Sequence, residues 1–243
     1  MVKKIVGTGV LLVLALALQA GVKMYTLKSP DGKVKLEVTA GQGIAYSLFY
    51  DGRLLLKPSR IALHTDLPEA DHWENIRITG TKQRHVSETV QAPFYRVKEF
   101  GIDCNELELR LNNGFSLLMR AYNDGMAYRF VAGRKGEMTV VEERAEFNFA
   151  DDFEAYIPYS TNPKDPWNMA FQNFYTKAPL TQYNTELPAF LPLTVDAGAV
   201  KLTLLESDLE AYPGMFVRGD GKTPALKGVF AAYPQETFKN KWR

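Results

Sequence analysis

The feature that most constrains this sequence is a two-residue alternation of apolar and polar side chains. It is clearest in segments 34–38, 106–111 and 200–204. Such alternation places one face of an extended strand in a core and the other in solvent. Asp-Gly or Asn-Gly pairs, which favour tight hairpin turns, separate the runs at residues 31–32, 51–52, 113–114, 124–125 and 220–221. Beyond residue 20 no segment of about twelve residues combines helical periodicity with caps, so the sequence predicts an all-β fold, a large antiparallel sandwich.

Length and charge limit the partners of this fold. A chain of 243 residues can form one large β domain without a second. Its 29 basic and 28 acidic residues give a net charge of +1 and form no basic block. This balance argues against nucleic acids and other polyanions as partners and favours a neutral ligand.

The N-terminus has the layout of a signal peptide. Lys3 and Lys4 precede an apolar run over residues 5–18, which ends at Gln19 and Ala20. We therefore expect residues 1–20 to be a signal peptide and the mature protein to begin near Gly21 in the periplasm or outside the cell, with no membrane association after cleavage. The alternative is a transmembrane anchor, which needs about 20 apolar residues, and the run over residues 5–18 is shorter than that.

A proline-rich stretch from residue 156 to 192 interrupts the alternation. Because proline cannot donate to a sheet ladder, we expect this stretch to be mainly loop. A loop of this length is usually functional or packed against another part of a protein, although it could also be a linker between two sub-sheets. It carries four aromatic residues that could stack on a sugar, Trp167, Phe171, Phe174 and Tyr175. The same rings could instead fill the end of a sandwich.

The sequence shows no grouping of residues that can be assigned as a catalytic site. His64, His72 and His85 lack metal-binding spacing, and neither a nucleophile elbow nor a phosphate loop is present. The adjacent carboxylates at 142–143 and 151–152 point to opposite faces of a strand, which is wrong for shared acid and base work. The single cysteine, Cys104, cannot form an intramolecular disulfide and is expected to be buried.

Three ordered motifs resemble the N-terminal domain of glycoside hydrolase family 97. They are the segments 27–32 (LKSPDG), 46–59 (YSLFYDGRLLLKPS) and 120–130 (RAYNDGMAYRF). The family includes exported α-glucosidases and α-galactosidases of polysaccharide-utilising bacteria. The resemblance implies a β-super-sandwich of the galactose-mutarotase kind over residues 21–243, packed against a catalytic (β/α)8 barrel.

The resemblance also implies where the chemistry lies. The family's catalytic carboxylates belong to the barrel, which would begin beyond Arg243, so we expect this chain to be inactive alone and its sandwich to be incomplete at the C-terminus. The family's N-terminal domain lends a glutamate to a calcium ion, and the motif aligns Gln172 with it, beside Asn173. Calcium is thus expected in the full-length enzyme, with Gln172 and Asn173 as candidate ligands, although Gln172 could merely hydrogen-bond a neighbouring loop.

The predicted function is that of a non-catalytic, carbohydrate-associated domain of an exported α-glycosidase. Its expected partners are the downstream barrel and an α-linked oligosaccharide, and the four aromatic residues would leave the isolated chain prone to self-association. One alternative is a free-standing carbohydrate-binding module. Another, a mutarotase-like enzyme, would need a histidine and a carboxylate to converge, which the histidine spacing does not support.

Overall fold

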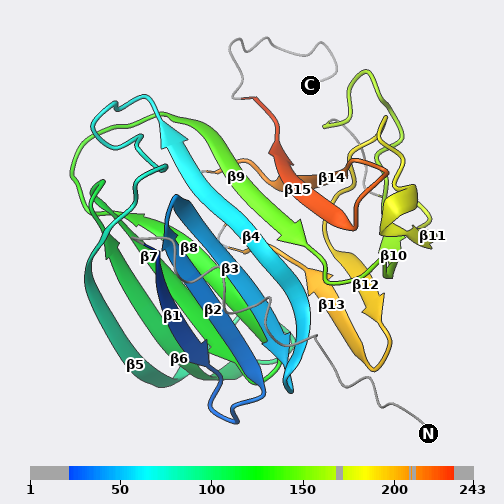
Figure 1. Cartoon of the computed structure of the whole chain (residues 1–243). Coiled ribbons are helices and arrows are strands. Elements are labelled where there is room, and N and C mark those ends of the chain that lie inside the picture. Colours follow the sequence, from blue (N-terminus) through cyan, green and yellow to red (C-terminus); the bar gives the residue numbers. More distant parts are fainter. Residues whose placement is uncertain (1–21, 168–171, 208, 210–211, 233–243) are drawn as a thin grey trace, which may run out of the picture. The chain divides into compact units, whose positions relative to one another are not determined.

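The computed structural model describes residues 22–167, 172–207, 209 and 212–232 (Figure 1). The predicted signal peptide, Phe171 and the C-terminal residues 233–243 lie outside the described residues. The described residues divide into two compact units. The first comprises the residues up to 45 and residues 72–136, and the second comprises residues 46–71 and those from 137 onward. No helix in the described part of the chain is long and apolar enough to cross a membrane.

The first unit is built from antiparallel strands. They are β1 (Lys23–Lys28), β2 (Val34–Gly41), the start of β3 (Gly43–Tyr50), β5 (Ile78–Gln91), β6 (Glu99–Leu111), β7 (Phe115–Tyr122) and β8 (Gly125–Ala132). β5 to β8 form a four-stranded sheet in chain order, and β1 to β3 are neighbours in a second sheet. β1 and β2 lie against β6 and β7, which makes this unit a sandwich (Figure 1).

The core of this sandwich follows from the alternation. Leu36 and Val38 of β2 are fully buried, and so are Leu107 and Leu109 of β6. The two residues of each pair are two positions apart, so their side chains lie on the same face of the strand. Cys104 is also fully buried and is the free cysteine expected from the sequence.

The Asp-Gly and Asn-Gly pairs mark turns, with one difference from the expectation. Asp51 and Gly52 both have positive φ, 48° and 78°, as a two-residue hairpin loop requires. Between β7 and β8, however, Tyr122 pairs with Gly125, so Asn123 and Asp124 occupy the loop. Gly125 is already the first residue of β8 and has no positive φ.

The second unit contains the remainder of β3 and most of the later strands. They are β4 (Arg53–Thr65), β9 (Val140–Asn148), β10 (Glu154–Ile157), β11 (Thr176–Pro179), β12 (Leu193–Ala197), β13 (Val200–Leu204), β14 (Met215–Gly219) and β15 (Ala225–Phe230). One sheet of this unit has the order β3-β4-β9-β15-β14 and the other has the order β11-β10-β12-β13. Its core includes Ile61, Phe149, Ile157, Leu193, Val217 and Leu226.

The proline-rich stretch is mainly loop, as expected, but its described residues include the end of β10 and two further regular elements. Thr176–Pro179 forms strand β11, and Leu180–Gln182 forms the short 3-10 helix η2. β11 is the edge strand of its sheet, a position where the missing N–H of Pro179 costs no ladder bond. The predicted all-β antiparallel sandwich is therefore confirmed, with a loop-rich segment that lies beside β10.

Candidate functional site

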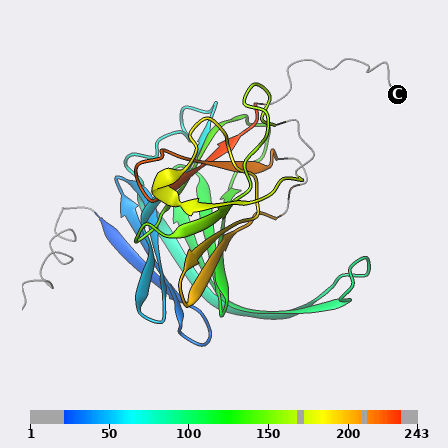
Figure 2. The same cartoon turned by 90° about the vertical axis from the view of Figure 1, so that its right-hand side faces the viewer.

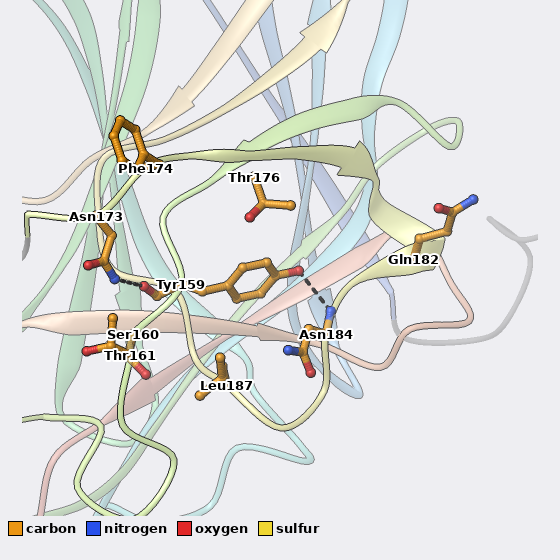
Figure 3. Close-up of a pocket in the computed structure, with 9 residues that line it drawn as sticks. All are labelled: Tyr159, Ser160, Thr161, Asn173, Phe174, Thr176, Gln182, Asn184 and Leu187. Carbon is orange, nitrogen blue, oxygen red and sulfur yellow. Dashed lines mark hydrogen bonds between the residues drawn. The ribbon is translucent and has the colours of Figure 1, made fainter.

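A pocket of about 500 Å³ opens in the loop-rich segment of the second unit (Figure 3). Nine residues line it: Tyr159, Ser160, Thr161, Asn173, Phe174, Thr176, Gln182, Asn184 and Leu187. They come from the chain after β10, the approach to β11, η2 and the loop that follows. None of the nine side chains carries a charge, so the pocket offers hydroxyl, amide and aromatic groups and the aliphatic side chain of Leu187.

Tyr159 crosses the middle of this pocket and is held at both ends (Figure 3). The backbone N–H of Asn184 donates to its hydroxyl at 2.8 Å, and the Nδ2 of Asn173 donates to its carbonyl oxygen at 2.6 Å. Its ring packs edge-on against Tyr183, with 5.0 Å between centroids. Burial raises the pKa of both tyrosines above the ordinary value, so both hydroxyls are neutral at physiological pH.

One polar atom of the lining is unsatisfied. The Oγ of Ser160 is buried and makes no hydrogen bond, although its backbone N–H donates to Pro188. A buried hydroxyl without a partner costs about 1–3 kcal/mol, and a water or a ligand hydroxyl that reached it would recover part of that cost. Ser160 is thus the one residue of the lining with a buried side-chain polar atom that has no partner among the described residues.

Phe174 gives the pocket an exposed aromatic face. Its side chain is 100% accessible, whereas most large apolar side chains of this unit are at least partly buried. A phenylalanine in this state contributes nothing to a core and presents its ring for stacking. Together with the neutral hydroxyl and amide groups, it suits a neutral, hydroxyl-rich ligand.

The residues predicted as carbohydrate contacts have different surroundings. Phe174 lines the pocket, and Phe171 lies outside the described residues. Tyr175 is partly exposed, and its hydroxyl donates to the carbonyl of Pro192 at 3.4 Å. Trp167 is half-buried, and its ring meets that of Phe216 on β14 edge-on, with 4.9 Å between centroids.

The two candidate metal ligands also differ. Asn173 lines the pocket and is half-buried, with its amide nitrogen committed to Tyr159. Gln172 is exposed and is not part of the lining. In the described residues no three His, Cys, Asp or Glu side chains gather in a way that could hold a metal ion.

Sequence reasoning missed most of the lining. The residues it did not single out are Tyr159, Ser160, Thr161, Thr176, Gln182, Asn184 and Leu187. Thr176 begins β11 and Gln182 ends η2, while the other five lie outside the named elements, so the seven residues follow no spacing rule. Only the density of prolines and aromatic residues signalled this region.

Two histidine–aspartate pairs and the adjacent glutamates of β9 lie outside the pocket. His64 contacts Asp71 at 2.7 Å and His85 contacts Asp103 at 3.1 Å, pairings that the spacing of the histidines did not reveal. The adjacent glutamates of β9 have different environments, since Glu142 is exposed and Glu143 is half-buried. None of these groups lines the pocket, and the nine lining residues include no histidine or carboxylate for proton transfer.

Comparison with known proteins identifies the family. The family model described as the glycosyl-hydrolase 97 N-terminal domain matches residues 27–243. The chain belongs to glycoside hydrolase family 97. A retaining alpha-galactosidase of Bacteroides thetaiotaomicron is 39% identical over 231 residues, which cover 92% of this chain and 34% of the relative. A probable retaining alpha-galactosidase of Streptomyces bingchenggensis is 26% identical over 158 residues, 63% of this chain and 24% of its own length.

Solved structures show the same fold at low identity. A glycoside hydrolase family 97 enzyme from a Pseudoalteromonas strain, solved in complex with acarbose, has a TM-score of 0.70 at 18% identity, over 85% of this chain and 32% of its own. A beta-arabinopyranosidase has a TM-score of 0.72 at 20% identity, over 86% and 35%. This family 97 chain spans about a third of the length of these relatives.

Proposed function

We propose that this chain is the non-catalytic N-terminal domain of an exported family 97 α-glycosidase, and that its pocket contributes to binding an α-linked oligosaccharide. The observation that carries the proposal is the composition of the pocket. Its lining combines a fully exposed phenylalanine with uncharged hydroxyl and amide groups. Sugars are recognised by such a combination, in which a ring covers an apolar sugar face and neutral polar groups meet the hydroxyls.

The proposal includes a structural role beside a catalytic (β/α)8 barrel. The relatives are named as a retaining and a probable retaining alpha-galactosidase, and they are about three and four times as long as the parts that match this chain. A loop-rich segment with an exposed phenylalanine and a partly exposed tyrosine fits a surface that another domain covers. In this arrangement the domain supports the barrel and walls part of its sugar pocket. Export through residues 1–20 belongs to the same proposal.

Gln172 and Asn173 are the candidate ligands for a calcium ion. The ion takes six to eight oxygen ligands, usually with carboxylates among them. Gln172 and Asn173 can offer two neutral carbonyl oxygens, and the described residues form no cluster of acidic side chains around them. These two side chains alone do not make a calcium site, so a contribution to calcium binding would need further oxygen ligands. No step of the proposed function depends on the ion.

Titration of the purified chain with α-linked oligosaccharides tests the binding role. Raffinose, which carries an α-galactosyl group, and maltotriose serve as probes in isothermal calorimetry. We expect weak binding of at least one of them and a loss of that binding in Phe174→Ala. A matched control is Phe94→Ala, which removes a phenylalanine that is equally exposed but lies in the first unit.

The same titration, carried out with this chain and with a longer protein that includes the rest of the enzyme, distinguishes the proposal from a free-standing binding module. A domain that supplies only part of a sugar site binds weakly alone and more tightly when the rest of the enzyme is attached. A complete binding module binds equally well in both forms. Binding that Phe174→Ala leaves unchanged would remove the pocket from the proposal.

A further inference from the structure

The hairpin of β5 and β6 is much longer than the rest of its sheet. β5 and β6 pair from Ile78 with Leu111 to Gln91 with Glu99, but β7 pairs with β6 only from Cys104 onward. Residues 87–103 therefore form a two-stranded ribbon with a connecting turn, here named the arm. Figure 2 shows the arm extending beyond β7 and β8. A two-stranded ribbon is only marginally stable alone, so an arm of this length is expected to gain support from a partner.

The arm ends in exposed apolar side chains. Phe94 is 98% accessible, and its exposed apolar neighbours in the arm are Val90, Tyr95, Val97 and Phe100. Single exposed apolar residues are ordinary on a protein surface, but five within eleven residues form a patch. Patches of this kind mark interaction surfaces. The arm therefore has an apolar surface that remains uncovered within its own unit.

Strand β5 adds an open hydrogen-bonding edge. In the part of the chain that the structure describes, β5 pairs with β6 alone and forms the edge of its sheet. Fourteen residues thus present a row of backbone N–H and C=O groups on their outer side. No proline interrupts the row, and its one irregularity lies at the start, between Ile78 and Gly80. An edge of this length is a template for pairing with another strand.

The charges on β5 match a second copy of the same strand. When two β5 strands pair antiparallel about His85, Lys82 of each copy lies opposite Glu88 of the other. Lys82, Arg84 and Glu88 share one face of β5, because their positions differ by two, four and six. The twofold symmetry therefore produces two identical pairs of opposite charge. Cross-strand pairs of this kind stabilise antiparallel sheets.

The competing register is less favourable. A shift that centres the pairing on Val86 would bring Arg84 opposite Glu88. The Nε of Arg84 is already bound to Glu106 at 2.6 Å, so this guanidinium has a partner within its own sheet. Centring on His85 uses Lys82, which leaves the Arg84 contact intact. Of these two registers, the one centred on His85 is therefore the better match to the charges.

The same register covers the tip of the arm. With His85 on the twofold axis, Ala92 of one copy lies opposite Ile78 of the other. Phe94 and Tyr95 then lie beside the start of the partner strand, where Arg77 is exposed and Ile78 is half-buried. A guanidinium can stack on an aromatic ring, and Ile78 adds apolar surface. One partner therefore accounts for both the open edge and the exposed tip.

We propose that this chain forms a twofold dimer in which the β5 edges pair antiparallel about His85 and each arm packs on the start of the other copy's β5. The twofold axis makes the interface self-complementary, as closed dimers require. The proposal is independent of sugar binding, because the pocket belongs to the second unit and the arm to the first.

Charge exchange in the full chain tests the register. Sedimentation equilibrium should show a reversible dimer for the wild type. Lys82→Glu and Glu88→Lys each place like charges opposite one another at two positions, and each should weaken the dimer about tenfold. The double variant Lys82→Glu/Glu88→Lys restores both pairs and should recover the wild-type affinity. Phe174→Ala, in the other unit, should leave the dimer unchanged.

A cysteine on the predicted axis gives a second, direct measurement. Under mild oxidation His85→Cys should form an intermolecular disulfide, because directly opposite Cβ atoms in an antiparallel pair are about 5 Å apart. Ser87→Cys, on the same face of the same strand, faces Gln83 of the other copy and should not cross-link. Cys104 is buried and does not interfere. A wild-type monomer at all concentrations, a double variant that fails to recover the dimer, or equal cross-linking of the two cysteine variants would overturn the proposal.

Discussion

The Nε of Arg120 lies 2.8 Å from Oε2 of Glu106, while the other oxygen of this carboxylate accepts from Arg84 at 2.6 Å. Glu106 is in β6, and the register places Arg84 of β5 and Arg120 of β7 directly opposite it on either side. The Glu106 side chain is only 7% exposed. The carboxylate thus connects three adjacent strands of the first unit. This contact sits at the base of the arm and fixes the sheet from which the arm extends.

Glu106→Gln should destabilise the chain. The amide keeps the shape of the side chain but loses the charge, and it leaves two guanidinium groups beside a neutral acceptor. Breaking a fully buried ion pair costs about 3–5 kcal/mol, but Arg84 is half exposed, so we expect a loss of about 2 kcal/mol. Urea denaturation measures it. Glu108→Gln, two residues along the same strand face, should cost less than half as much.

The pH dependence of stability should change with the same variant. Burial disfavours the charge of Glu106, but the hydrogen bonds from Arg84 and Arg120 outweigh it, so the pKa of Glu106 lies below its usual value. A carboxyl group with a lowered folded-state pKa stabilises the fold above its unfolded pKa, and this contribution disappears as the pH falls through the folded pKa. The wild type should therefore lose its advantage over Glu106→Gln in acid. A difference independent of pH would contradict this account.

Glu143 should show the opposite behaviour. Burial raises its pKa above the usual value and the nearby charge of Glu206 adds to this, although a hydrogen bond from Tyr212 opposes it. A carboxyl group with a raised folded-state pKa destabilises the fold at pH values above that pKa, and the penalty fades as the pH falls below it. Glu143→Gln should thus raise the free energy of unfolding by about 1 kcal/mol at neutral pH.

The gain from Glu143→Gln should shrink as the pH is lowered through the range in which carboxyl groups titrate. The neighbouring Glu142→Gln is the control, because Glu142 is exposed on the opposite face of β9. Thermal unfolding of the three proteins between acid and neutral pH provides the comparison. If both variants gained stability equally, general charge reduction would be the cause instead of the environment of Glu143.

The strands could be predicted from the sequence because each depends on local alternation. Segments 34–38 and 106–111 lie within β2 and β6, and their apolar faces are buried as the alternation predicts, but Glu106 on the polar face of β6 is buried as well. The contact of Glu106 with Arg84 and Arg120 could not be predicted, because it depends on the register of strands 14 and 22 residues apart. Between β7 and β8 the Asp-Gly pair predicted the wrong loop residues, because Asn123 and Asp124 form the two-residue loop and Gly125 already belongs to β8.

The pocket was predictable only as a region. Prolines indicated irregular backbone over residues 156–192, but the shape of that backbone depends on contacts such as the one between Tyr159 and Asn184. Such contacts join residues with no periodic relationship. The arm was missed for a related reason: the strand pattern predicts two strands, but it cannot reveal that β7 stops pairing at Cys104.

The purified chain should not hydrolyse aryl α-glucosides or α-galactosides. Glycoside hydrolysis requires two carboxyl groups that face each other across the scissile bond, and the pocket is lined only by uncharged side chains. Chromogenic assays with both substrates should give the rate of the blank. Turnover that remains with the chain through repeated purification would show that a catalytic pair exists elsewhere in it.

Processing of the N-terminus is expected in a Gram-negative host. We expect the two lysines at positions 3 and 4 and the apolar run that follows to direct export, and cleavage should leave Gly21 at or near the start. Mass spectrometry of the periplasmic fraction measures the mature mass. Folded, soluble protein that retains Met1 would contradict export. Lys3→Glu/Lys4→Glu should slow processing by removing the positive charge.

Ser160→Ala should affect stability and sugar binding in opposite directions. The Ser160 hydroxyl is buried without a partner, and such a group costs about 1–3 kcal/mol, so its removal should leave the unliganded chain equally stable or more stable by about 1 kcal/mol. If a sugar hydroxyl satisfies Ser160 in the complex, the same substitution should weaken binding by about fivefold, the value of one neutral hydrogen bond.

Thermal unfolding and calorimetric titration with raffinose measure the two effects. Thr161→Val, at the neighbouring position of the lining, is the matched control. A variant that loses stability but keeps its sugar affinity would mean that Ser160 is satisfied by an internal water and takes no part in binding.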